Sequence, residues 1–264
     1  MNAILAQVTD GTSQPTNLWQ WLSDSSQRTV SGPIPSQLWT TLWHSLLAFS
    51  IAMAIGIPLA AILGHYRRAE VAASWVVNLG RIIPTVTILG FAVLISLRNG
   101  YGFEPWPIVF ALVVLALPPL FANTYTAVRE ASPDAVNAAR AMGLTEGQIL
   151  RRIELPLALP LILAACRIAL TQVVATEALG ALFGSGGLGI YVRFGFANNE
   201  IYQIQAGALL VAGAAMSVDL VFWFLTRFIV PKSLRQRPAS ERVPRAVRLP
   251  NQPQPQTQSL GGIT

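Results

Sequence analysis

The chain has 264 residues, of which 53% are hydrophobic and 11% charged, and its mean hydropathy is +0.50. A soluble globular domain carries about 25% charged residues, so this composition excludes a soluble enzyme and indicates an integral membrane protein. The net charge of +6 does not indicate a nucleic-acid-binding surface, because nearly all of it comes from residues 231–264.

Five apolar stretches are long enough to cross a bilayer, for which a helix needs about 20 residues. None alternates apolar and polar residues as a strand would, and a helix satisfies its own backbone polar groups in lipid. The sequence therefore predicts an all-α integral membrane protein with about five transmembrane helices. The stretches are residues 38–63, 71–97, 106–125, 156–183 and 201–230.

Lysine and arginine are distributed unevenly around these stretches. With the N-terminus outside, the inner segments hold twelve of them and the outer segments three, and an excess of basic residues is typical of cytoplasmic loops. We therefore expect an extracytoplasmic segment over residues 1–35, a transmembrane domain over 36–230 and a cytoplasmic tail over 231–264. The tail is basic and rich in proline and glutamine, a composition typical of disorder and of contact with anionic lipid.

The inner loop at residues 129–155 has signals for two short helices. Ser132 is a preferred N-cap residue, Pro133 suits a first helical position, and Asp134 complements the positive end of the helix dipole. Gly143 stands where a glycine with positive φ would end this first helix.

A second helix is predicted directly after that glycine. Thr145 and Gln148 have the spacing of a capping box, and Ile149 and Ile153 contribute an apolar side. Pro156 is expected to bound this helix. The loop would then hold two short helices joined by a tight glycine corner.

Small side chains recur at helical spacing in the first of these helices. Ala135, Ala138, Ala139 and Met142 fall on one face. From spacing alone two interpretations stay open: the face packs on the inner ends of the protein's own spans, or it docks a partner.

The loop resembles the Glu-Ala-Ala signature of ABC-importer membrane subunits, in which a glycine and then Ile-x-Leu-Pro follow that tripeptide at fixed distances. The spacing is kept throughout, and Asn137 replaces the glutamate. The resemblance implies that this loop couples the chain to a cytoplasmic ATPase. The matching residues are Asn137, Ala138, Ala139, Gly143, Ile153, Leu155 and Pro156.

The similarity extends over residues 117–199, which look like the permease subunits of osmoprotectant importers. It implies a type I ABC-importer transmembrane domain in the bacterial inner membrane. It also implies three partners: a cytoplasmic ATPase dimer that binds ATP and Mg²⁺, a second permease that is the same or a different chain, and an extracytoplasmic solute-binding protein.

Signals for catalysis or cofactor binding are missing from the sequence. No G-x-x-x-x-G-K-[ST] motif occurs and Lys232 is the only lysine, so ATP hydrolysis requires a partner. The glycines at residues 184–189 have the spacing of a dinucleotide-binding fingerprint, but they follow a membrane helix and favour a tight outer turn or gate segment. His44 and His65 form no metal-binding pattern, and we interpret them as interface residues.

Charged residues inside membrane spans are costly and often functional. Arg167 and Asp219 are placed to pair between the fourth and fifth spans, which would be a structural role. Arg81 precedes Pro84, where a broken helix would border a pathway, although snorkelling explains the arginine equally well. Glu177 lies near the outer end of its span, where water is an alternative partner. The candidate pathway residues are Arg81, Pro84, Glu177 and Asp219.

We therefore predict a permease subunit that moves an osmoprotectant such as glycine betaine, choline or carnitine and catalyses no covalent reaction. A quaternary ammonium favours aromatic faces, which Trp75, Phe91 and Trp223 would supply. Residues 81–85 depart from the pattern expected in betaine permeases, so importers of methionine, phosphonate or alkylsulfonate are the alternative. An intramembrane enzyme is more distant, because the spans contain no carboxylate pair or nucleophile–base pair at helical spacing.

Overall fold

The computed structural model describes residues 17–23, 32–67, 84–103 and 105–229, and every regular element within these ranges is helical. This confirms the predicted all-α class. The elements are α2 (Leu18–Ser23), α3 (Ile34–His65), α5 (Thr85–Arg98), α6 (Trp106–Arg129), α7 (Pro133–Ala141), α8 (Glu146–Ile149), the π-helix η2 (Leu150–Glu154), α9 (Leu155–Glu177), the 3₁₀-helix η3 (Ala178–Phe183), α10 (Gly189–Asn198) and α11 (Ile201–Ile229).

Four of the five predicted spans coincide with helices that are long and apolar enough to cross a membrane. They are α3, α6, α11 and the unbroken helical run Glu146–Phe183, which contains α9. In the remaining predicted span, residues 71–97, the structure describes the 14-residue helix α5. The residues before α5 that include Trp75 and Arg81 lie outside the described residues.

The central helix of the described domain is α6. It packs against α3, α5 and α9, and 61% of its most apolar stretch is buried, against 11% for α11. Ala111 and Ala116 of α6 and Ala48 and Ala52 of α3 are among the most deeply buried side chains. Such small residues let helices approach closely, which is the usual basis of helix packing in membranes.

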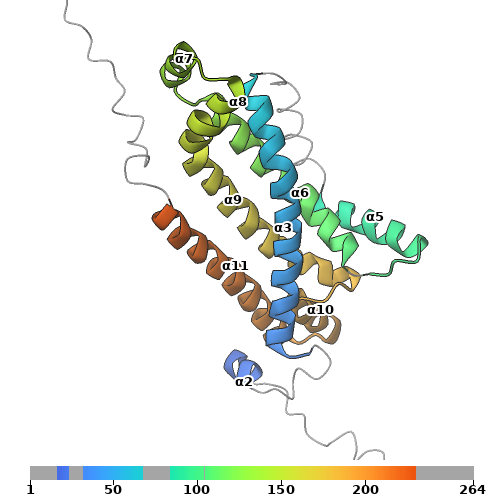
Figure 1. Ribbon diagram of the computed structural model, residues 1–264. Helices are drawn as coiled ribbons and strands as arrows, with labels where there is room; N and C mark the ends of the chain where they lie inside the picture. Colours follow the sequence, from blue (N-terminus) through green and yellow to red (C-terminus); the bar gives the residue numbers. More distant parts are fainter. Residues whose placement is uncertain (1–16, 24–31, 68–83, 104, 230–264) are drawn as a thin grey trace, which may run out of the picture. The chain divides into compact units, whose positions relative to one another are not determined.

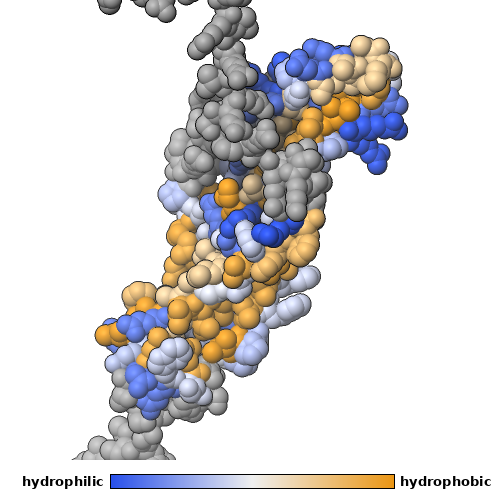
Figure 2. Space-filling model, turned by 90° about the vertical axis from the view of Figure 1, so that its left-hand side faces the viewer, coloured by the Kyte–Doolittle hydropathy of each residue, from blue (hydrophilic) through white to orange (hydrophobic). Residues whose placement is uncertain are grey.

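The helices α7 and α8 lie at one end of the domain and α10 at the other (Figure 1). We call these the loop end and the opposite end. α3 and α6 terminate at the loop end and α9 begins there, while α11 packs against α9 and α10. In a side view, hydrophobic residues cover much of the surface, and hydrophilic residues gather toward its two ends and in a patch near its middle (Figure 2).

α3 and α6 approach each other closely at Gly64. A Cβ there would lie 2.9 Å from the carbonyl oxygen of Tyr125 and 3.2 Å from Cβ of Val128. We expect Gly64→Ala to lower the free energy of unfolding by about 1–3 kcal/mol, because the packed helices have no room for the added methyl group.

The matched control is Gly213→Ala in α11, where a Cβ would meet nothing within 4 Å. This change should be neutral or stabilising by up to about 1 kcal/mol, the helix-propensity gain of alanine over glycine. Thermal unfolding of the detergent-solubilised protein measures both variants. Equal stability of the two would show that the α3–α6 contact is looser than described.

Candidate functional site

The first loop helix, α7, begins as the sequence predicts. The Ser132 hydroxyl oxygen accepts a hydrogen bond from the backbone N–H of Ala135 at 3.5 Å, and Pro133 occupies the first helical position. Asp134 lies in the first turn and Arg140 in the last, so both charges complement the helix dipole.

Gly143 ends α7 in a Schellman motif. Its φ is +81°, a value that favours glycine. The N–H of Gly143 donates to the carbonyl of Arg140 at 2.9 Å, and the N–H of Leu144 donates to the carbonyl of Ala139 at 3.1 Å. These are the two bonds that define the motif, and they confirm the predicted glycine corner.

The second loop helix starts at the predicted residue but does not end at Pro156. The backbone N–H of Thr145 donates to Gln148 Oε1 at 3.0 Å, which completes the capping box. The prediction that Pro156 bounds the helix is wrong, because η2 continues α8 directly into α9 with Pro156 in the first turn of α9. Pro156 has no N–H to donate to the preceding turn. The wider π turn lies directly before it and is closed by the N–H of Leu155, which donates to the carbonyl of Leu150.

The signature residues of the first loop helix divide between its two sides, while Ile153 lies in η2 and Leu155 and Pro156 begin α9. Ala139 is completely buried in a small cluster that also contains Val136, Ile149, Leu144 and Ile153. This side therefore packs on α8 and η2.

The other side of α7 is open. Asn137, Ala138, Met142 and Gly143 are exposed, and a Cβ on Gly143 would meet nothing within 4 Å. We call these four residues the exposed face of α7. Its small side chains would allow a partner to approach the backbone closely.

A polar network joins the loop to the end of α3. His65 Nδ1 lies 2.6 Å from Glu154 Oε2, and its Nε2 lies 3.2 Å from Glu146 Oε2. Arg140 donates through Nε and Nη2 to both oxygens of Glu146 at 3.0 Å, and these bonds raise the pKa of its guanidinium. His65 and Glu154 are buried, so they fix the loop to α3 away from solvent.

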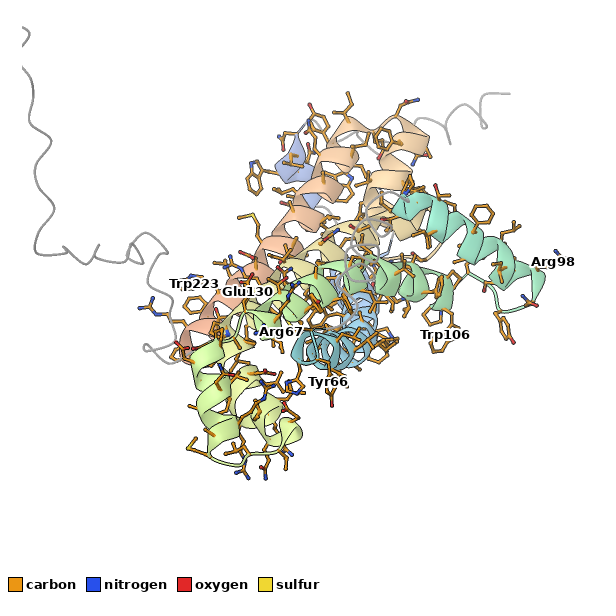
Figure 3. The ribbon with its side chains drawn as sticks, turned by 90° about the horizontal axis from the view of Figure 1, so that it is seen from above. Tyr66, Arg67, Arg98, Trp106, Glu130 and Trp223 are labelled. Atoms are coloured by element: carbon orange, nitrogen blue, oxygen red, sulfur yellow. The ribbon has the colours of Figure 1, made fainter. Side chains whose placement is uncertain are left out.

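A polar hollow of about 510 Å³ opens beside this network, and Asn137 is part of its wall. Seen from the loop end, Tyr66 and Arg67 at the end of α3 lie close to the loop helices, whereas Arg98 lies at the far end of α5 (Figure 3). The hollow is lined by His65, Tyr66, Arg67, Pro133, Val136, Asn137, Arg140, Glu146 and Glu154.

A second buried histidine–glutamate pair lies at the opposite end. His44 Nδ1 is 3.1 Å from Glu177 Oε1, and both side chains are buried. Glu177 therefore faces a histidine, not water. Nearby, the N–H of Gly187 donates to Gln37 Oε1 at 2.9 Å and the N–H of Leu188 to Thr41 Oγ1 at 2.8 Å.

The turn at residues 184–189 is thus bound to the first part of α3. Gly184, Gly186 and Gly187 all have positive φ, as a tight turn requires. This arrangement agrees with the predicted turn and not with a dinucleotide-binding loop.

Arg167 and Asp219 form the pair that the sequence predicts. Arg167 Nε donates to Asp219 Oδ1 at 2.6 Å and its Nη2 to Oδ2 at 2.5 Å, joining α9 to α11. Of the other candidate pathway residues, Pro84 precedes the first residue of α5 and Arg81 lies outside the described residues. The described part of the chain does not bring Pro84, Glu177 and Asp219 into one cluster.

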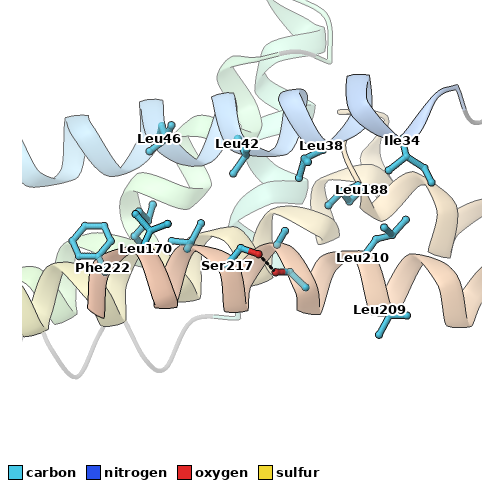
Figure 4. A pocket seen from close by; sticks show the side chains of 14 residues that line it. Ile34, Leu38, Leu42, Leu46, Leu170, Leu188, Leu209, Leu210, Ser217 and Phe222 are labelled. Carbon is cyan, nitrogen blue, oxygen red and sulfur yellow. Dashed lines mark hydrogen bonds between the residues drawn. The ribbon is translucent and has the colours of Figure 1, made fainter. Parts of the chain in front are cut away.

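An apolar groove of about 560 Å³ runs between α3 and α11 (Figure 4). Leucine side chains dominate its wall, Phe222 is its one aromatic residue, and Ser217 bonds back to Gly213 of its own helix. No charged residue lines it, so the groove has no group that would hold a charged solute.

Comparison with known proteins identifies the fold and the family. Residues 40–235 match the family described as binding-protein-dependent transport system inner membrane component. Among solved structures, the chain is similar to a chain of the inward-facing MetNI methionine ABC transporter, with a TM-score of 0.66 and 25% identity over 74% of this chain and 94% of that one.

Three curated relatives are permeases. The carnitine transport permease protein OpuCD of Listeria monocytogenes is 32% identical over 79% of this chain and 92% of its own length. The osmoprotectant import permease protein OsmW of Salmonella typhimurium is 30% identical over 78% and 95%. The choline transport system permease protein OpuBD of Bacillus subtilis is 34% identical over 68% and 78%.

The fold, the loop signature and the family match together define a membrane-spanning subunit of a solute importer. The chain belongs to the family of inner-membrane components of binding-protein-dependent transport systems. It is a permease subunit of an ABC importer.

Removal of the His65 side chain tests the link between the loop and α3. In His65→Ala the buried carboxylate of Glu154 loses its partner, which should lower the free energy of unfolding by about 1–3 kcal/mol. His65→Gln, whose amide can donate to the same carboxylate, should lose clearly less. Thermal unfolding of the purified variants measures both, and a His65→Ala variant as stable as the wild type would mean that this bond does not hold the loop.

Proposed function

We propose that this permease imports a quaternary-amine osmoprotectant and that the exposed face of α7 couples transport to ATP hydrolysis on partner subunits. The observation that carries the coupling role is the arrangement of the loop. Ala139 and Ile153 of the signature pack the two loop helices together. Asn137, Ala138 and Gly143 of the signature belong to the exposed face of α7 at the loop end.

Two connections support transmission of movement from α7 into the membrane domain. The helical run Glu146–Phe183 is unbroken, so a displacement of α8 moves α9 with it. His65 bonds to Glu154 and Glu146, so the end of α3 follows the loop. Alternating access by rigid-body movement of helices requires such stiff attachments.

The sidedness and the partners follow from the same arrangement. The loop end would face the cytoplasm, where an ATPase dimer binds ATP and Mg²⁺ and contacts the exposed face of α7. The N-terminal segment and the turn at residues 184–189 would lie outside, on the side of a solute-binding protein. A second permease, identical or different, would complete the pathway. The count of basic residues on the inner segments supports this orientation.

The proposed solute class rests on the relatives. Permeases named for carnitine, osmoprotectants and choline are 30–34% identical over more than two thirds of this chain. The second candidate is methionine, favoured by the similarity in fold to a methionine transporter at 25% identity. The sequence relatives support the quaternary amines more strongly, because their similarity is higher.

Gly143→Asp tests the coupling role. Aspartate at this positive φ is strained relative to glycine but less so than most residues, and it brings a charged side chain into the exposed face of α7. We expect solute uptake to fall by at least about tenfold, which corresponds to a loss of roughly 1.4 kcal/mol in partner binding. Uptake into vesicles and co-purification of the ATPase measure the effect.

Gly147→Asp is the matched control. Gly147 is exposed on the second loop helix, and a Cβ there also meets nothing within 4 Å. The same charge added there should leave uptake near the wild-type value, because Gly147 is not part of the exposed face of α7. If both variants transported normally, α7 would not be the coupling element.

The solute class is tested by uptake in a strain that lacks other osmoprotectant importers. Expression of this permease with its ATPase and binding protein should restore accumulation of radiolabelled glycine betaine, choline or carnitine under salt stress. Excess unlabelled methionine should not compete. Accumulation of methionine in place of the quaternary amines would refute the solute assignment and leave the importer assignment intact.

A further inference from the structure

The Arg167–Asp219 pair lies deep within the membrane domain. Each residue is at least ten positions from either end of its helix, which corresponds to about 15 Å along the axis. Since the hydrocarbon core of a bilayer is about 30 Å thick, a bilayer centred on these two helices would hold both charges near its middle.

This pair is not enclosed by the chain that carries it. The side chains of Arg167 and Asp219 are 37% and 35% exposed, although two hydrogen bonds join them. An ion pair facing lipid at this depth is costly, and charged residues in spans face a water-filled cavity or another subunit instead. The exposed side of the pair is therefore expected to face either a water-filled cavity or polar groups of another subunit.

The pair shares one side of α11 with exposed side chains. At 100° per residue, Met216 and Trp223 lie within about 60° of Asp219 around the helix, and Val221 lies about 160° away. Met216 and Trp223 are exposed, and Arg227 already stacks on the Trp223 ring at 5.6 Å, so that ring accepts a cation. Val221 lines the apolar groove toward α3. One side of α11 is thus apolar, and the other carries charge and an aromatic ring.

We propose that Arg167, Asp219 and Trp223 form a solute-contacting site on the import path. This proposal rests on the proposed function. The carboxylate of Asp219 and the face of Trp223 would receive the quaternary ammonium, and the guanidinium of Arg167 would receive the carboxylate of a zwitterion such as glycine betaine. When no solute is present, Arg167 and Asp219 bond to each other. Solute binding would replace these bonds, so the net gain in free energy is small and the solute can be released.

Single cysteines locate the exposed side of the pair. Cys166 is the only cysteine of the chain and is buried, so Cys166→Ala provides the background. Met216→Cys and Val221→Cys, at 65% and 63% exposure, form a matched pair on opposite sides of α11. The probe is (trimethylammonio)ethyl methanethiosulfonate, which is permanently charged and does not enter lipid, applied to the complete complex in membrane vesicles.

We expect the probe to label Met216→Cys and not Val221→Cys. Saturating glycine betaine should slow the labelling of Met216→Cys by at least about tenfold, and labelling should block uptake. Absence of labelling at Met216→Cys would place the pair against another subunit or lipid. Equal labelling of both cysteines, or labelling that the solute does not slow, would also overturn the proposal.

Exchange of the two charges separates solute contact from structure. In the double variant R167D/D219R the ion pair can re-form, so a structural pair would regain transport that the single variant Asp219→Arg loses. For a solute-contacting site we expect the double variant to assemble with its ATPase while uptake stays at least about tenfold below wild type. Full recovery of uptake would overturn the proposal.

These tests distinguish a failure of the site from a failure of the proposed solute. If the wild-type complex carried methionine, also a zwitterion, the solute assignment would be wrong. If methionine then slowed the labelling of Met216→Cys by the probe, the pair would still lie on the import path. If methionine did not slow it, the proposed site would be refuted.

Discussion

The bond between His65 and Glu154 is the contact on which the arrangement of the loop depends. It is short and buried, and it holds the loop helices against the end of α3. A buried carboxylate without a partner is costly, so the loop cannot swing away from α3 without losing that stabilisation. The loop is consequently packed on the membrane domain and is not a loose connection between two spans.

Three polar contacts at different depths converge on one continuous helical run. Glu154 reaches His65 of α3 at the loop end, Arg167 reaches Asp219 of α11 in the middle, and Glu177 reaches His44 of α3 at the opposite end. α9 is therefore tied to both helices that border the apolar groove. A rotation or shift of α9 would therefore change all three contacts together.

The alanine face of the loop is divided between internal packing and exposure. Ala139 is buried and closes the contact with the second loop helix, whereas Ala138, one residue earlier, is exposed. The signature serves both for internal packing and for presenting a surface, because adjacent positions on a helix point about 100° apart. Asn137, which replaces the glutamate of the signature, borders a hollow that already contains Glu146 and Glu154.

The sequence by itself determined four of the five predicted spans, the helix caps of the loop and the glycine corner, because each depends on composition or on bonds between residues a few positions apart. The Arg167–Asp219 pair was also predictable, since few charges occur in the spans. The partners of the two histidines were not, because they lie 89 and 133 residues away and depend on how each helix is rotated. Tertiary structure likewise decided that the helix continues past Pro156 instead of ending there, since the π-helix η2 joins α8 to α9 without a break.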